Sequence, residues 1–246
     1  MESEEYRRMA GVEDTMWYYR ALHAHVRRAL AAQLGARAAA VLDAGCGTGG
    51  LIRRLRRSDP AWSWTGVDLS PLACELARER THAEIRQASI TALPFGDATF
   101  DAVVSADVLY HVDDDGGAIR EFARVLKPGG VVVVNVPAHR WLWSYHDVTT
   151  HAKRRYARGE LREKLAAAGL RATTLTHWNT VLLPLVAVRR KLFPAPVSGS
   201  DVRAYPAVDA LLGAVTGLER LCLNAGASFP FGTSIFAVAK KAPAIE

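Results

Sequence analysis

The chain has 246 residues, and half of them are hydrophobic, so it is long enough to bury the core of one large domain. Its net charge of +6 at pH 7 suits an acidic small molecule, nucleic acid or an anionic membrane surface, and charge alone does not choose among them. The three cysteines are scattered without metal-ligand spacing, which argues against a zinc site and against a disulfide framework.

The N-terminal region, residues 1–37, is predicted to form a helical cap. In it, Trp17-Tyr18-Tyr19-Arg20 leads into a helix over residues 21–34. The first five residues are acidic and have no signal-peptide pattern. The longest apolar run near the other end, residues 181–188, is interrupted by Pro184 and is too short to span a bilayer. We therefore expect a cytoplasmic protein.

An apolar strand followed by a glycine-rich turn stands at residues 41–50, and a helix begins directly after it. Asp43 precedes three alternate glycines, Gly45, Gly47 and Gly49. Glycine lets such a turn adopt positive φ and lie against a ligand, to which the unpaired N–H groups of the next helix point. The spacing differs from the dinucleotide fingerprint, and the absence of a lysine excludes a P-loop. An acid at the strand end suits a ligand with an ammonium or sulfonium group.

A second short strand ends in an acid, Asp68, about 20 residues after the glycine turn, where folds of this kind place a ribose-binding carboxylate. The two oxygens of Asp68 can accept both ribose hydroxyls. The less favoured alternative is that Asp43 only caps a turn and that Asp68 only accepts turn amides. A helix is predicted over residues 71–80, with Ser70 as its N-cap and Pro71 at its first position.

The remaining elements continue the alternation of strands and helices. A third strand and turn are predicted within 83–95, a fourth strand and its loop over 100–111, a fifth strand after the turn at 127–130, and a sixth strand over 171–177. An insertion over 178–230 contains two helical stretches, 180–193 and 205–224, joined by residues 194–200. The last strand is predicted over 233–239.

These motifs, in this order over residues 38–137, resemble the class I S-adenosylmethionine-dependent methyltransferases. The resemblance implies an α/β fold with a doubly wound, mostly parallel seven-stranded Rossmann-like sheet, an N-terminal helical cap and a helical insertion before the last strand. It divides the chain into a cap (1–37), a cofactor-binding core (38–177), an insertion (178–230) and a last strand with its tail (231–246). It also implies cofactor-binding roles for Asp43, Gly45, Gly47, Gly49, Asp68, Leu69, Ser89, Ile90, Ser105, Tyr19 and Arg20. An acid usually stands at the place of Ser89, and Tyr19 and Arg20 either approach the methionine carboxylate or belong to a helix packed on the sheet edge.

Acceptor-facing residues are expected after the fourth and fifth strands. Tyr110 and His111 follow the fourth strand, and the near-neutral pKa of an ordinary histidine suits a general base; the alternative is a loop histidine that only hydrogen-bonds to the backbone. His146 and His151 belong to an aromatic, histidine and arginine-rich stretch after the fifth strand, which resembles one bacterial branch of the family. That stretch either walls an acceptor pocket, clamping a carboxylate or phosphate, or packs under a loop. Metal binding by His146, Asp147 and His151 is the less favoured alternative, so no metal is predicted.

The predicted reaction transfers a methyl group from S-adenosylmethionine to oxygen, nitrogen or carbon of a small-molecule acceptor. The alternatives are an RNA or protein acceptor, or a cofactor-binding protein without catalysis; no RNA-binding module accompanies the basic clusters, so nucleic acid is not favoured. Apolar residues recur at helical spacing in the insertion, most regularly at Leu211, Leu212, Val215, Leu218 and Leu221. They predict a lid over the acceptor pocket or a homodimer contact, which we favour over contact with an anionic membrane.

Overall fold

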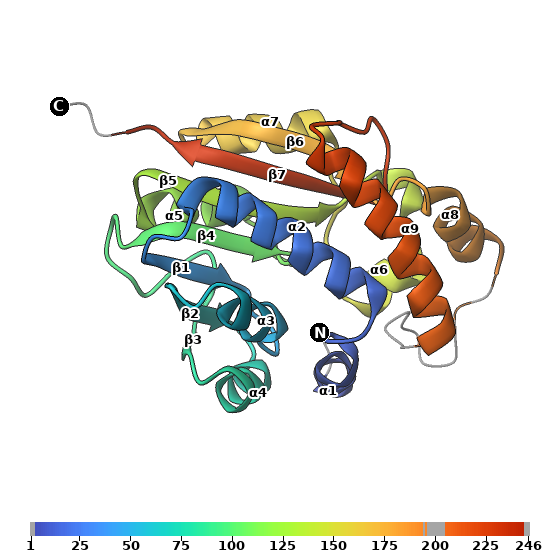
Figure 1. Ribbon diagram of the computed structural model, residues 1–246, viewed down its shortest axis with the longest axis horizontal. Coiled ribbons are helices and arrows are strands. Elements are labelled where there is room, and N and C mark those ends of the chain that lie inside the picture. Colours follow the sequence, from blue (N-terminus) through green and yellow to red (C-terminus); the bar gives the residue numbers. More distant parts are fainter. Residues whose placement is uncertain (1–2, 194, 196–204, 244–246) are drawn as a thin grey trace.

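A seven-stranded sheet forms the centre of the computed structural model, which describes residues 3–193, 195 and 205–243 (Figure 1). The strand order is β3-β2-β1-β4-β5-β7-β6. The five strands on one side, β3 to β5, are parallel, and β7 runs antiparallel to both of its neighbours. The strands are β1 (Ala39–Ala44), β2 (Trp62–Asp68), β3 (Glu84–Gln87), β4 (Phe100–Ala106), β5 (Leu126–Pro137), β6 (Leu170–Trp178) and β7 (Ser234–Lys241). This sheet confirms the predicted doubly wound, mostly parallel fold.

The central strands are buried on both faces, which explains why they read as continuous apolar runs. Successive residues point to opposite faces, so Val41 belongs to one hydrophobic cluster and Leu42 to the other. The helices α2 (Trp17–Leu34), α3 (Gly50–Ser58) and α4 (Pro71–Thr81) contribute to the first cluster. The helices α5 (Asp115–Val125) and α7 (Arg158–Ala167) contribute to the second. The sheet is therefore covered on both sides.

The predicted N-terminal helices are present as α1 (Ser3–Val12) and α2. Two helices also lie between β6 and β7, namely α8 (Leu183–Leu192) and α9 (Pro206–Asn224). The first of them begins three residues later than predicted, with Pro184 in its first turn, where the missing N–H of proline costs no hydrogen bond. The predicted connection over 194–200 lies, except for residue 195, outside the described residues.

Short elements gather where the parallel strands end. These are η1 (Leu109–His111), η2 (Arg140–Leu142) and α6 (Tyr145–Thr149). In Figure 1 the labels of α1, α6, α8 and α9 all lie toward this side of the sheet. Ligands of open α/β sheets bind at this edge, so these elements border the expected site. Within the described ranges, none of the helices has the length and apolarity needed to cross a membrane.

Candidate cofactor and acceptor site

The glycine turn between β1 and α3 takes the conformation that its sequence predicts. Gly45, Gly47 and Gly49 have φ angles of +98°, +51° and +83°. A Cβ at Gly45 would collide with Val108 after β4, so that glycine is required by packing within the fold. A Cβ at Gly47 would lie 2.9 Å from the end of Met9 on α1. Gly47 therefore borders the space between the turn and the N-terminal helix.

Asp68 closes the turn from the end of β2. Its Oδ2 accepts the backbone N–H of Gly47 at 2.9 Å, and its Oδ1 accepts that of Ser70, also at 2.9 Å. The hydroxyl of Tyr6 on α1 also contacts Asp68; burial, followed by the charge of Asp68, raises the pKa of Tyr6 to about 12. The predicted ribose-binding carboxylate thus already holds the turn, and α1 reaches over it.

Asp43 is buried at the end of β1, directly before the turn. Burial, followed by the charges of the nearby Asp68 and Glu13 carboxylates, raises the pKa of Asp43 to about 8. Three carboxyl groups therefore approach one small region, where their negative charges disfavour one another. A cationic ligand at this place would relieve that repulsion. These carboxyl groups fit the sulfonium and ammonium groups of S-adenosylmethionine, and they do not fit a pyrophosphate.

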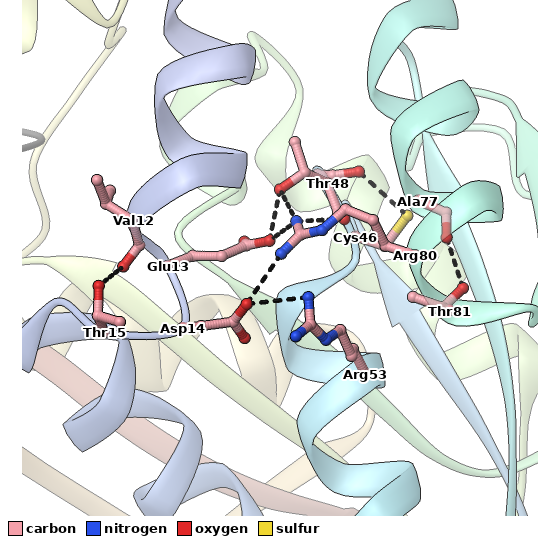
Figure 2. A network of polar contacts seen from close by, with 11 residues as sticks. Val12, Glu13, Asp14, Thr15, Cys46, Thr48, Arg53, Ala77, Arg80 and Thr81 are labelled. Carbon is pink, nitrogen blue, oxygen red and sulfur yellow. Dashed lines mark hydrogen bonds and ion pairs between the residues drawn. The ribbon is translucent and has the colours of Figure 1, made fainter.

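The turn between α1 and α2 locks the N-terminal cap onto the glycine turn (Figure 2). The buried carboxylate of Glu13 accepts the hydroxyl of Thr48 at 2.7 Å and pairs with Arg80 of α4. The adjacent Asp14 pairs with Arg80 at 3.3 Å and with Arg53 of α3 at 3.0 Å. Sequence reasoning missed these contacts, because partners 35 or more residues apart leave no local pattern.

A buried polar network lies beside the site, at the ends of β4 and β5. Asp107 accepts the hydroxyl of Tyr18 at 2.8 Å and the side-chain amide of Asn135 at 2.8 Å. Asn135 in turn accepts the indole N–H of Trp178 at 2.7 Å. Burial raises the pKa of Asp107 to about 6, while the two hydrogen bonds favour its ionised form. Asp107 also has a φ of +58°, which is uncommon for this residue type.

Sequence reasoning missed this network too. Its one local signal is Asn135, a single polar residue that follows four consecutive valines in a strand buried on both faces. A buried amide requires partners, so its presence indicates a polar neighbour across the sheet.

The other predicted cofactor residues lie around this region. Tyr19 is half-buried, and burial followed by the charges of Glu13 and Asp107 raises its pKa. Arg20 is exposed and lies close enough to Arg54 of α3 for its charge to add to the burial that lowers the pKa of Arg54. Tyr19 therefore lies near the carboxylates of the site.

Four further predicted positions follow β2, β3 or β4. Leu69 is 69% exposed, whereas Ile90 is buried in a hydrophobic cluster. The hydroxyl of Ser89 lies 2.7 Å from that of Thr91 and also accepts the Thr91 N–H, so it stabilises its own turn. The buried hydroxyl of Ser105 has no hydrogen-bond partner within the described part of the chain. A buried hydroxyl without a partner is costly and fits a polar atom of a ligand.

On the acceptor side, the structure brings together residues that follow β4 and β5. The rings of Tyr110 and His111 lie 4.0 Å apart. The ring of His111 hydrogen-bonds to the backbone of His151, and Lys153 donates its N–H to the Tyr110 carbonyl at 2.8 Å. Burial lowers the pKa of His111 to about 4, so this ring is neutral at pH 7. His146 stands on the neighbouring α6.

The charged residues of the same stretch are held in ion pairs. Arg155 binds both oxygens of the buried Asp147, at 2.7 and 3.0 Å, and Arg154 pairs with Asp115 at 3.1 Å. Both arginines therefore already have a carboxylate partner, while Arg154 Nε has no hydrogen-bond partner among the described residues, and the anion clamp stays a prediction. Asp147 is likewise engaged, and the described residues contain no cluster of three potential metal ligands.

The comparisons with known proteins agree with this geometry. Residues 42–134 match the family model described as methyltransferase domain. The chain is 38% identical over 151 residues to a malonyl-[acyl-carrier protein] O-methyltransferase of Enterobacter lignolyticus, covering 58% of this chain and 59% of that protein. It is 42% identical over 118 residues to a demethylmenaquinone methyltransferase of Tropheryma whipplei, covering 45% and 47% of the two chains.

A solved structure shares the fold over nearly the whole chain. It comes from a complex between the Trm112 methyltransferase activator of Haloferax volcanii and a putative methyltransferase; the match has a TM-score of 0.66 and 23% identity and covers 99% of this chain and 96% of that one. By contrast, the chain spans about half of the length of the two curated relatives that it matches. By its motifs, its matched domain and its fold, the chain resembles the class I S-adenosylmethionine-dependent methyltransferases, and residues 42–134 match a methyltransferase domain.

Proposed function

We propose that this protein transfers a methyl group from S-adenosylmethionine to an oxygen, nitrogen or carbon atom of a small molecule, releasing S-adenosylhomocysteine. The observation that carries the proposal is the approach of Asp43 and Asp68 to one glycine turn, which makes a negatively charged site for a cationic cofactor. The bound cofactor supplies an activated methyl group on a sulfonium that is a good leaving group. The protein then has to align the acceptor with this methyl group and exclude water.

The positions of several residues support the proposed cofactor contacts. Asp68 accepts the ribose hydroxyls, Asp43 lies toward the positive charge of the cofactor, and Gly47 allows close approach of the backbone. Tyr19 faces the methionine part, and Ser105 supplies a free hydroxyl. The other positions assigned to cofactor binding are Gly45, Gly49, Leu69, Ser89, Ile90 and Arg20.

The acceptor is placed against Tyr110, His111, His146 and His151. Because the His111 ring is neutral at pH 7 and engages the backbone of His151, it can orient the acceptor and receive a proton from it. Its pKa of about 4 makes it a weaker base than the near-neutral histidine expected from the sequence. A proton acceptor is needed only if the acceptor atom arrives protonated. The names of the two curated relatives concern an acyl-carrier-protein-bound malonyl group and a demethylmenaquinone, and they support transfer to metabolites rather than to RNA.

Formation of S-adenosylhomocysteine in the presence of candidate acceptors tests this function. We expect its production to depend on a metabolite acceptor. Binding of S-adenosylmethionine without turnover on any acceptor would favour a binding protein, and a salt-sensitive mobility shift of RNA together with its methylation would favour a macromolecular acceptor.

Substitution of the acceptor-side histidines separates acceptor binding from cofactor binding. We expect His111→Ala and His151→Ala to lower turnover on the identified acceptor by about 10²- to 10⁴-fold if the acceptor must lose a proton, and His146→Ala to lower it less. S-adenosylmethionine affinity, measured by calorimetry, should remain close to that of the wild type. Full turnover in all three variants would place the acceptor elsewhere.

The raised pKa of Asp43 predicts that cofactor affinity depends on pH. A carboxyl with a pKa of about 8 is mostly protonated at pH 6, and a cationic ligand favours its ionised form, so binding releases a proton. Affinity should therefore rise by up to about tenfold per pH unit between pH 6 and 8 and then level off. Asp43→Asn has nearly the same shape and cannot ionise, so it should lose this part of the rise. Calorimetry in two buffers of different ionisation enthalpy measures the released proton, and an unchanged pH profile in the variant would contradict the role of Asp43.

The remaining sequence-based predictions become part of this proposal. In this proposal the cap covers the cofactor, the core binds it, and the insertion lies on the acceptor side. A homodimer and a cytoplasmic location stay predictions, to be tested by light scattering and by cell fractionation.

A further inference from the structure

The helix α9 buries polar residues and exposes apolar ones, which is the reverse of an ordinary surface helix. Its buried residues are Asp209, Thr216 and Glu219, all of them polar. Its leucines point the other way: Leu211 is 66% exposed and Leu218 is 68% exposed. Surface helices normally bury their apolar stripe and expose their polar one. The exposed leucines of α9 therefore form an apolar face that no described part of the chain covers.

The helix α8 extends this surface. It has no buried residue, and its exposed apolar side chains Leu185, Val188 and Leu192 recur at helical spacing. The helix adjoins η2 and α6, where Lys191 donates to the Trp143 carbonyl at 2.9 Å and the Arg189 guanidinium lies over the Tyr145 ring. We call the exposed apolar residues of the two helices the α8/α9 face: Leu185, Val188, Leu192, Val208, Leu211, Leu218 and Leu221. Exposed apolar residues that recur along two successive helices mark an interaction site.

The charged residues of the two helices that reach solvent are all basic. Both acidic residues are buried and bound to backbone amides: Asp209 accepts from Trp17 and Tyr205, and Glu219 accepts from Thr180 and Val181. The basic residues Arg189, Arg190, Lys191 and Arg220 all retain contact with solvent. The described part of the helix pair thus presents apolar and positively charged groups without an exposed carboxylate.

The combination of exposed apolar and basic side chains distinguishes between two binding partners, a second copy of the chain and an anionic membrane. In a two-fold dimer the same face packs against itself, which would bring basic residues of both copies close together without acidic partners on these helices. The interface of an anionic bilayer accepts both components, because the apolar side chains enter the acyl boundary and the basic ones pair with lipid headgroups. We propose that the α8/α9 face docks this protein peripherally on an anionic membrane, in place of the lid or homodimer contact that the sequence favoured for these helices.

The two helices of the α8/α9 face lie on the same side of the sheet as the candidate site. Both helices lie toward the edge of the sheet where the parallel strands end, and α8 touches the η2–α6 stretch (Figure 1). An acceptor dissolved in the bilayer would therefore reach the acceptor-side residues from the docked face. The docking rests only on the exposed apolar and basic side chains of the two helices, so it does not depend on methyl transfer.

Sedimentation of the full chain with lipid vesicles tests the proposal. We expect binding to vesicles of phosphatidylcholine containing phosphatidylglycerol, and weak binding to phosphatidylcholine alone. The double variant Leu211→Ser with Leu218→Ser should bind at least about tenfold more weakly, because each leucine loses its transfer from water. Lys191→Gln should weaken binding by about fivefold, the effect of one basic residue near an anionic surface. Arg57→Gln, an exposed basic residue of α3, is the matched control and should bind as the wild type does.

Three results would overturn the proposal. The first is the absence of binding to the anionic vesicles. The second is binding that the leucine variant leaves unchanged. The third is a dimer in light scattering that this variant converts to monomer, which would assign the face to a second copy. The substituted side chains are exposed, so thermal unfolding should be unchanged and shows that each variant is folded.

Discussion

Replacing Asp68 by alanine is expected to weaken S-adenosylmethionine binding by on the order of 2–4 kcal/mol, or roughly 30- to 700-fold. The carboxylate accepts the Gly47 and Ser70 amides through different oxygens, and each oxygen has a second lone pair for a ribose hydroxyl. The alanine variant therefore loses two charge-assisted ribose contacts and also the bond that holds Gly47 in place. Isothermal titration calorimetry measures the loss directly.

Two further variants separate ribose binding from support of the turn. Asp68→Asn retains one oxygen acceptor and nearly the same shape, so its loss of affinity should lie between those of the wild type and of Asp68→Ala. Tyr6→Phe removes the hydroxyl that contacts Asp68 in the absence of ligand, without changing the carboxylate. It should bind the cofactor as tightly as the wild type or more tightly. Undiminished affinity in a folded Asp68→Ala protein would show that this carboxylate does not bind the ribose.

The position of the candidate cofactor residues at one edge of the sheet was predictable because its signals are local. Gly45, Gly47 and Asp68 each stand at a strand end, and a parallel sheet brings successive strand ends to one edge without further information. The strands themselves followed from apolar runs between turn residues. Fold and candidate cofactor residues were therefore accessible from short stretches of sequence.

Contacts between distant segments were not predictable in this way. Glu13 meets Thr48 and Arg80 only because α1 and α2 fold back over the turn, and no pattern near Glu13 indicates its partners. The apolar spacing in α9 likewise predicted a helical face without its direction. The structure turns Asp209 and Glu219 inward, where each satisfies two backbone amides, and this leaves the leucines outside. The periodicity of apolar residues shows that apolar and polar side chains lie on different sides of a helix. Tertiary contacts decide which of these sides is buried.

Replacing Asn135 by leucine is expected to destabilise the protein by roughly 3 kcal/mol, because it leaves Asp107 with one fewer donor and the Trp178 indole N–H without its acceptor. For a chain of this size, the melting temperature should fall by roughly 6–12 °C at pH 8. Asn224→Leu, at an exposed position at the end of α9, is the matched control and should change stability by less than about 0.5 kcal/mol. Calorimetric melting of the three proteins provides the comparison.

The pH dependence of this loss identifies Asp107 as its source. The pKa of Asp107 in the folded protein, about 6, lies above that of an unfolded aspartate, so its contribution to stability declines as the pH rises from about 4 to 6. Removing the Asn135 donor disfavours the ionised carboxylate further and raises this pKa in the variant. At pH 5 the carboxyl is mostly neutral in both folded proteins, and only the loss at Trp178 and the remaining polar contacts should be seen. Above pH 6 the variant bears the additional cost of ionising Asp107, so the difference in melting temperature should be larger at pH 8 than at pH 5. A difference that stays constant over this range would mean that Asn135 acts through packing and Trp178, and that Asp107 does not depend on it.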